Sequence, residues 1–245
     1  MKLILVEGLP GTGKTTISNW IFEILTDRGK QAELLLEDDE RLPSNFAHIA
    51  GIPKDALPNL PADAVLARTD HYIYADLRQC AKGYRRWDIG DEYNKHISAE
   101  EYARCALEWW QNWARNYAGE SICVMDSAFL QNPVNEMIFR GATDAQTEAY
   151  IRAVAEALAP LHPVCIYLRR ESAEESISFA KAAKGSGWAK GVGSALQKLH
   201  CPDLFERRFR LEYSLLSSMD HILCEVNGSD WSAVKKKTLD YLSSE

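Results

Sequence analysis

The sequence lacks long hydrophobic runs, an excess of positive charge and any paired-cysteine motif. Its first apolar run, Leu3 to Val6, has four residues and ends at Glu7. That length is far short of a signal-peptide core or a membrane span. The 245 residues contain 28 Lys and Arg against 35 Asp and Glu, a net charge of −7. This balance disfavours general nucleic-acid binding through a basic surface, so any anionic ligand must be met by a few placed cations.

The cysteines and histidines do not suggest a metal cage or a disulfide framework. The six cysteines form no C-x-x-C pair, and Cys123, Cys165 and Cys224 lie inside apolar runs. The six histidines are scattered, without an i, i+4 pair. We therefore expect reduced core thiols, a cytoplasmic location and no membrane association.

Short apolar runs alternate with helical patterns along the chain. Strands are predicted at 2–7, 32–36, 121–125, 162–168 and 221–226, and helices at 14–28, 63–82, 98–117, 144–158, 172–183, 203–219 and 231–242. This alternation predicts an α/β fold with a five-stranded, mostly parallel sheet between two helical layers. We expect a single domain over 1–245, with a helical insertion at about 40–120 between the second and third strands.

The segment between the first strand and the first helix carries the clearest chemical signal. Gly8 to Thr15 satisfies G-x-x-x-x-G-K-[ST], the Walker A or P-loop pattern. Its backbone N–H groups can surround phosphate oxygens, Lys14 can reach the β- and γ-phosphates, and Thr15 can bind Mg²⁺. The expected cofactors are ATP and Mg²⁺, and the expected cofactor-binding residues are Gly8, Leu9, Pro10, Gly11, Thr12, Gly13, Lys14, Thr15 and Thr16.

Acidic residues follow the second and third strands, at the sheet edge where open parallel sheets bind ligands. Asp126 ends an apolar strand and is a candidate Mg²⁺ ligand together with Thr15, although an Asp that caps the following loop gives the same pattern. After the second strand, Glu37-Asp38-Asp39 offers an acid to orient an acceptor hydroxyl. On position alone we select Asp38 first and Asp39 second; a solvated turn is the alternative. The candidate catalytic residues are Lys14, Asp38, Asp39 and Asp126.

Basic residues gather in the last third of the chain. Arg169 and Arg170 follow the fourth strand, and a Gly- and Lys-rich stretch at about 181–193 contains Lys181, Lys184 and Lys190. This stretch is a candidate lid over bound phosphates, and a solvated basic face is the alternative. The aromatic helix containing Tyr102, Trp109, Trp110 and Trp113 fits core packing better than a base-stacking surface.

With these motifs, the chain resembles the P-loop small-molecule kinases, a group that includes thymidylate, adenylylsulfate, shikimate and chloramphenicol kinases. The resemblance rests on Gly8–Thr16, the acids after strands two and three, and the fourth strand followed by a helix and a lid-like stretch. It implies the three-layer P-loop NTPase fold, an acid after strand two that contacts the acceptor, and basic lid residues that bind phosphates. Asp126 is followed by Ser127-Ala128-Phe129, unlike the Asp-Arg-Tyr-like run of thymidylate kinases, and the lid candidate contains no arginine.

The expected function is that of an ATP-dependent phosphotransferase, a P-loop kinase acting on a small hydroxyl- or phosphate-bearing acceptor. The alternative is a P-loop nucleotide-binding regulator or weak ATPase with no small-molecule acceptor. A GTPase is disfavoured because Asn94-Lys95-His96-Ile97 lacks the Asp of a guanine-reading motif. The single acid Asp126 disfavours an AAA-type motor, in which two acids follow one another.

Overall fold

The five apolar runs predicted as strands pair into one sheet. The computed structural model describes residues 1–56, 59–117, 121–198 and 200–243. Every neighbouring pair in the sheet is parallel, and the strand order is β2-β6-β1-β7-β8. The strands are β1 (Leu3–Glu7), β2 (Ala32–Leu35), β6 (Ile122–Asp126), β7 (Pro163–Arg169) and β8 (Asp220–Glu225). The predicted five-stranded parallel sheet is confirmed.

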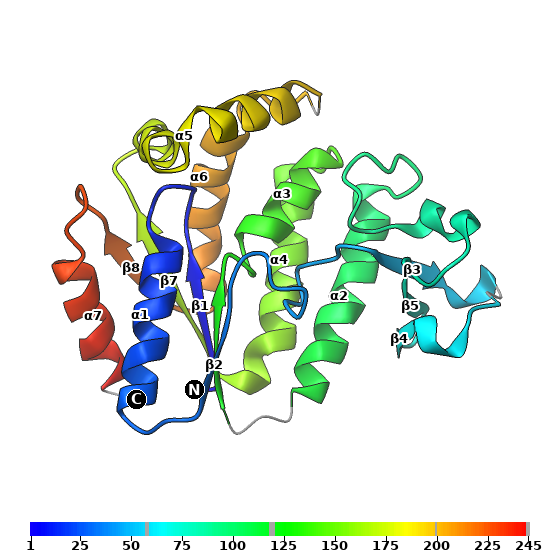
Figure 1. Cartoon of the computed structure of the whole chain (residues 1–245), viewed down its shortest axis with the longest axis horizontal. Helices are drawn as coiled ribbons and strands as arrows, with labels where there is room; N and C mark the ends of the chain where they lie inside the picture. Colours follow the sequence, from blue (N-terminus) through cyan, green and yellow to red (C-terminus); the bar gives the residue numbers. More distant parts are fainter. Residues whose placement is uncertain (57–58, 118–120, 199, 244–245) are drawn as a thin grey trace.

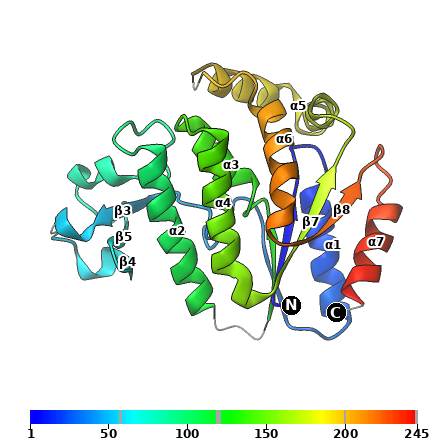
Figure 2. The same cartoon turned by 180° about the vertical axis from the view of Figure 1, so that it is seen from behind.

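Helices cover both faces of this sheet, as Figures 1 and 2 show from opposite sides. One face carries α1 (Lys14–Asp27) and α7 (Ser232–Leu242). The other carries α3 (Gln131–Phe139), α4 (Asp144–Leu158) and α6 (Leu204–Leu215), with α2 (Ala99–Asn116) packed outside α4. Both interfaces are apolar, because Leu3, Leu5 and Met125 face one helical layer while Ile4 and Val6 face the other. Among the described helices, none combines the length and apolar character needed to cross a bilayer.

The first residues of two helices follow from their N-terminal capping residues. Ser98 Oγ accepts a hydrogen bond from the backbone N–H of Glu101 at 3.1 Å, which fixes the predicted start of α2. Thr143 and Gln146 form a reciprocal capping box at the start of α4. By contrast, α3 was not predicted, because Pro133 lies in its first turn and gives the segment the pattern of a loop. Proline is tolerated there, since an N–H in the first turn has no intrahelical partner.

The insertion is not purely helical, which corrects the prediction. It contains an antiparallel sheet of order β3-β5-β4, formed by β3 (Ile49–Pro53), β4 (Val65–Arg68) and β5 (Tyr72–Asp76). The helix predicted at 63–82 is therefore wrong. Two short apolar runs there flank the polar turn Thr69-Asp70-His71, and the N–H of Thr69 donates to the carbonyl of Tyr72 at 3.0 Å. Aromatic and β-branched residues on either side of such a turn favour a hairpin.

The insertion shares its core with the main sheet. Tyr74 from β5 and Tyr102 and Trp110 from α2 are fully buried in the same apolar cluster as Leu3 and Leu5 of β1. Tyr74 donates its hydroxyl to the carbonyl of Cys105 at 2.6 Å, which joins the small sheet to α2. The aromatic helix therefore serves packing, as predicted.

The candidate lid stretch is also helical and belongs to α5 (Ala173–Lys198). The helix predicted at 172–183 ends close to the predicted place, because Gly185 has the non-helical angles φ 82° and ψ 177°; a second helical segment, which was not predicted, completes α5 beyond this kink. In Figures 1 and 2 it lies across the end of the sheet where β1 and β7 terminate. The candidate lid stretch is thus a helical arm placed over the carboxyl ends of the strands.

Candidate nucleotide-binding site

The loop Gly8–Gly13 joins β1 to α1, and its glycines are required by its shape. Gly8, Gly11 and Gly13 have φ values of 138°, 84° and 87°, a region that side chains disfavour. A Cβ at Gly11 would lie 2.2 Å from the Ser176 carbonyl oxygen of α5, and one at Gly13 would lie 2.0 Å from the Trp231 ring. The loop is therefore enclosed by α5 on one side and by the residue before α7 on the other.

Lys14 and Thr15 begin α1 directly behind this loop. Lys14 is buried, and its Nζ donates to the Leu9 carbonyl oxygen at 3.2 Å. Burial lowers the pKa of Lys14, while the carboxylates of Asp126 and Glu37 act in the opposite direction. The ammonium thus lies within the field of two carboxylates, one at the end of β6 and the other in the loop after β2.

Asp126 meets Thr15 across the sheet edge. The Thr15 hydroxyl donates to Asp126 Oδ2 at 2.6 Å, and the Ser127 hydroxyl donates to Oδ1 at 2.7 Å. Ser127 adopts a positive φ of 66°, which turns the chain immediately after β6. The structure therefore brings together the two residues predicted to bind Mg²⁺.

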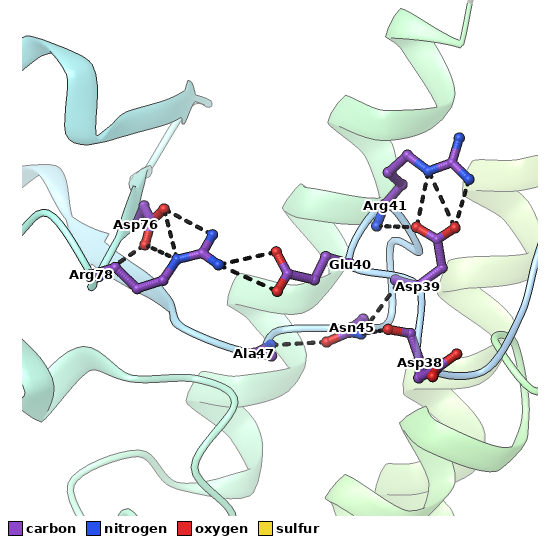
Figure 3. A network of polar contacts seen from close by, with 8 residues as sticks. All are labelled: Asp38, Asp39, Glu40, Arg41, Asn45, Ala47, Asp76 and Arg78. Atoms are coloured by element: carbon purple, nitrogen blue, oxygen red, sulfur yellow. Dashed lines mark hydrogen bonds and ion pairs between the residues drawn. The ribbon is translucent and has the colours of Figure 1, made fainter.

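Of the three acids after β2, Glu37 is the one that lines the cavity next to Lys14. The Gln131 side-chain amide donates to Glu37 Oε1, which holds this carboxylate against α3. Asp39 lies instead in a surface ion pair with Arg41, whose guanidinium lowers the pKa of that carboxyl group. Asp38 is exposed, and its backbone carbonyl accepts from Asn45 at 3.4 Å (Figure 3).

A cavity of about 550 Å³ opens above the glycine-rich loop. Its floor is formed by Lys14, Thr15 and Thr16, and aromatic side chains contribute to its walls. Cations reach it from three elements: Arg170 after β7, Lys184 on α5 and Arg208 on α6. The lining residues are Pro10, Gly11, Gly13, Lys14, Thr15, Thr16, Glu37, Gln131, Asn135, Phe139, Arg170, Phe179, Ala183, Lys184, Trp188, Val192, Leu196, Leu204, Phe205, Arg208, Ser229 and Trp231.

Arg170 ties three parts of this cavity together. Its Nε donates to the Gly11 carbonyl at 3.0 Å and its Nη2 donates to the Gly228 carbonyl at 3.0 Å. Its guanidinium also stacks 3.5 Å from the ring centroid of Phe179 on α5. Arg170 therefore fixes the glycine-rich loop, the loop after β8 and α5 relative to one another.

Arg208 is held by a fully buried carboxylate. Its Nε donates to Glu212 Oε1 at 2.6 Å, and the Tyr167 hydroxyl donates to Glu212 Oε2 at 2.9 Å. Arg208 and Glu212 are 1% and 0% exposed, so this charge pair is shielded from water. The arrangement fixes the guanidinium at the cavity wall.

The candidate lid contributes only part of its basic residues. Lys184 lines the cavity beside Trp188, with its Nζ 5.6 Å from the indole ring, whereas Lys181 and Lys190 are exposed residues outside the lining set. Arg169 stacks on Phe209 and Tyr213 away from the cavity. The basic residues expected to act together are therefore divided between the cavity, which Lys184 lines, and the surface outside it, where Lys181 and Lys190 lie.

Sequence reasoning missed Glu37 as the preferred acid, and also Gln131, Asn135 and Trp231. A signal existed only for Glu37, which lies one residue nearer the strand than Asp38. Within the described ranges, no group of three or more His, Cys, Asp or Glu residues could hold a metal ion, and the six cysteines form no disulfide.

No family model matches the chain, and a comparison with curated proteins finds no significantly similar sequence.

Proposed function

We propose that the protein is an ATP-dependent phosphotransferase with the P-loop NTPase fold, transferring the γ-phosphoryl group to a small acceptor. The observation that carries the proposal is the hydrogen bond that the Thr15 hydroxyl donates to Asp126 Oδ2 at 2.6 Å, beside the buried Lys14. It joins the Walker A sequence to an acid delivered by a neighbouring parallel strand. That combination is what phosphoryl transfer requires at the triphosphate.

The residues present fit Mg²⁺. Thr15 offers a hydroxyl oxygen and Asp126 a carboxylate oxygen, the hard ligands that Mg²⁺ takes from proteins while phosphates and water complete its shell. Bound there, Mg²⁺ would supply positive charge against the triphosphate. The Ser127 hydroxyl, which donates to the other Asp126 oxygen, would hold the carboxylate in position.

The remaining roles follow from charge and placement. Backbone N–H groups of the glycine-rich loop and Lys14 would bind the β- and γ-phosphates, and Arg208 would oppose charge that develops during transfer. Phe179, Trp188 and Trp231 give the cavity an aromatic wall that suits a nucleobase. Glu37, and not Asp38 or Asp39, would accept the acceptor's proton, because it lines the cavity next to Lys14.

The test is ADP production and phosphoryl transfer by wild type and Lys14→Ala, measured with Mg²⁺ and a panel of acceptors. We expect acceptor-dependent turnover that falls by roughly 10²–10³-fold in the variant. Thermal unfolding of both proteins shows whether the variant retains its fold. Full turnover in a folded Lys14→Ala protein would contradict the proposal. ADP production that no acceptor changes would favour a regulator or weak ATPase.

A further inference from the structure

A second cavity of about 290 Å³ adjoins the first and shares Glu37, Asn135 and Phe139 with it. Its other walls come from the loop after β2, from Gly90 in the insertion and from α3. The full lining set is Glu37, Ser44, Asn45, Phe46, Ala47, Gly90, Asn132, Asn135, Glu136 and Phe139. Two cavities that share Glu37 place a second molecule within reach of a γ-phosphate held at Lys14.

The loop that forms one wall is firmly held. Asn45 donates through Nδ2 to the carbonyls of Asp38 and Asp39, at 3.4 and 3.2 Å, and its Oδ1 accepts from Ala47 N–H at 3.0 Å (Figure 3). A Cβ at Gly90 would lie 2.2 Å from the Phe46 carbonyl oxygen, so the insertion packs directly on this loop. The cavity therefore has fixed walls suited to selecting a ligand.

Polar atoms at these walls lack protein partners. Ser44 is 5% exposed, and its Oγ has no hydrogen-bond partner in the described part of the chain. The same holds for the side-chain carbonyl oxygen of Asn135, which lines both cavities. It also holds for that of Gln131, which lines the first cavity only, is 4% exposed and holds Glu37. Buried polar groups are normally hydrogen-bonded. Amide oxygens accept hydrogen bonds, so these atoms favour a ligand with hydroxyl or amine groups that donate hydrogen bonds to them.

The charge of the cavity disfavours an anion. Its lining contains the acidic side chains of Glu37 and Glu136, the latter paired with Arg140, and no Lys or Arg. Three guanidinium groups of the surrounding segments already have protein partners. Arg140 donates hydrogen bonds to the carboxylate of Glu136 and to the backbone carbonyls of Ile89, Asp91 and Ile97. Arg41 donates to Asp39, and Arg78 donates to both Asp76 and Glu40 (Figure 3).

We infer, on the basis of the proposed function, that the acceptor bound here is an uncharged or amine-bearing polyhydroxylic compound and not a phosphorylated one. Its hydroxyl oxygen forms a bond to the γ-phosphorus of ATP while the bond from that phosphorus to the β,γ-bridging oxygen breaks. ADP leaves, and the hydroxyl proton passes to Glu37. Phe139, which lines both cavities, provides an apolar face for the acceptor.

The experiment uses pairs of acceptors that differ only in a phosphate group: nucleosides against their 5′-monophosphates, and glucose and glucosamine against their 6-phosphates. An aminoglycoside is included as an amine-bearing probe. Transfer from labelled ATP is measured for each. We expect Lys14-dependent transfer to at least one uncharged or amine-bearing member, at a kcat/KM at least tenfold above that of its phosphorylated counterpart.

Two variants test the cavity itself. Asn132→Arg adds a cation to the wall and should reduce the preference for the unphosphorylated member by about tenfold. Ser44→Ala should raise KM by about tenfold, with little change in kcat, because it removes a ligand partner. Asn116→Arg, at the exposed end of α2, is the matched control for the added charge and should leave the preference unchanged. Thermal unfolding verifies that each variant is folded.

The outcomes separate the two proposals. Lys14-dependent transfer that favours the phosphorylated members overturns the acceptor class and leaves the phosphotransferase intact. A folded Asn132→Arg protein with an unchanged preference also overturns the assignment of this cavity. ADP production that no member of the panel alters contradicts the proposed function, and with it this inference.

Discussion

Replacing Glu212 by Gln removes the carboxylate that holds Arg208. The two side chains are 0% and 1% exposed, and Nε of Arg208 lies 2.6 Å from Glu212 Oε1. Gln keeps an oxygen to accept one hydrogen bond but leaves the guanidinium buried without its counter-charge, beside the ammonium of Lys14. Breaking a buried pair in this way costs about 3–5 kcal/mol. For a chain of this size, the melting temperature should fall by about 6–20 °C.

The free energy of unfolding is measured by urea denaturation, with thermal unfolding as a second observable. Asp144→Asn is the matched control, because Asp144 is 53% exposed in its 2.7 Å pair with Arg207 and should cost less than about 1 kcal/mol. The double variant Arg208→Met, Glu212→Gln should recover much of the loss, since no buried charge remains. A Glu212→Gln protein within 1 kcal/mol of wild type, or a double variant no more stable than the single one, would refute this reasoning.

Three further predictions follow from other contacts. Burial raises the pKa of Glu7 from 4.5 to about 7. Between these two pH values, the Glu7 carboxyl group is therefore protonated in the native state and ionised in the unfolded chain. The free energy of unfolding should therefore fall by on the order of 3 kcal/mol as pH rises from 4.5 to 7, and a Glu7→Gln protein with an equally steep profile would contradict this. Gly51→Ala, whose Cβ would lie 2.1 Å from Cys105 Sγ, should lower the unfolding free energy by about 1–3 kcal/mol, with recovery in a Cys105→Ala background. Arg170→Lys cannot reproduce the forked contacts to Gly11 and Gly228, so ATP titration should show affinity at least tenfold weaker; unchanged affinity would remove Arg170 from the site.

The main sheet could be predicted because its strands are buried on both faces and form continuous apolar runs. The small antiparallel sheet of the insertion could not, since β4 and β5 are short segments whose strand conformation depends on pairing with each other and on packing against α2. Tyr74 illustrates this, because its hydroxyl contact with the Cys105 carbonyl joins residues far apart in the chain. The helix α3 was missed for a local reason, the proline in its first turn.

The site shows the same division between local and tertiary information. The loop Gly8–Gly13 and Lys14 are contiguous, so their pattern is visible in the sequence. Choosing among Glu37, Asp38 and Asp39 requires knowing which side chain faces α3, and the Gln131 contact that selects Glu37 comes from a helix absent from the prediction. Position after a strand locates such an acid only to within a residue or two.

The pairing of β1 has a consequence for how the chain folds. Leu3 lies opposite Cys123 on one side and Pro163 on the other, so both neighbours of the central strand are synthesised long after it. During translation, β1, α1 and the glycine-rich loop cannot complete their pairing and packing until β6 and then β7 have left the ribosome. Such long-range pairing makes folding slow and leaves an apolar strand without partners in the meantime. The segment with the clearest chemical signature is thus completed only when most of the chain has been made.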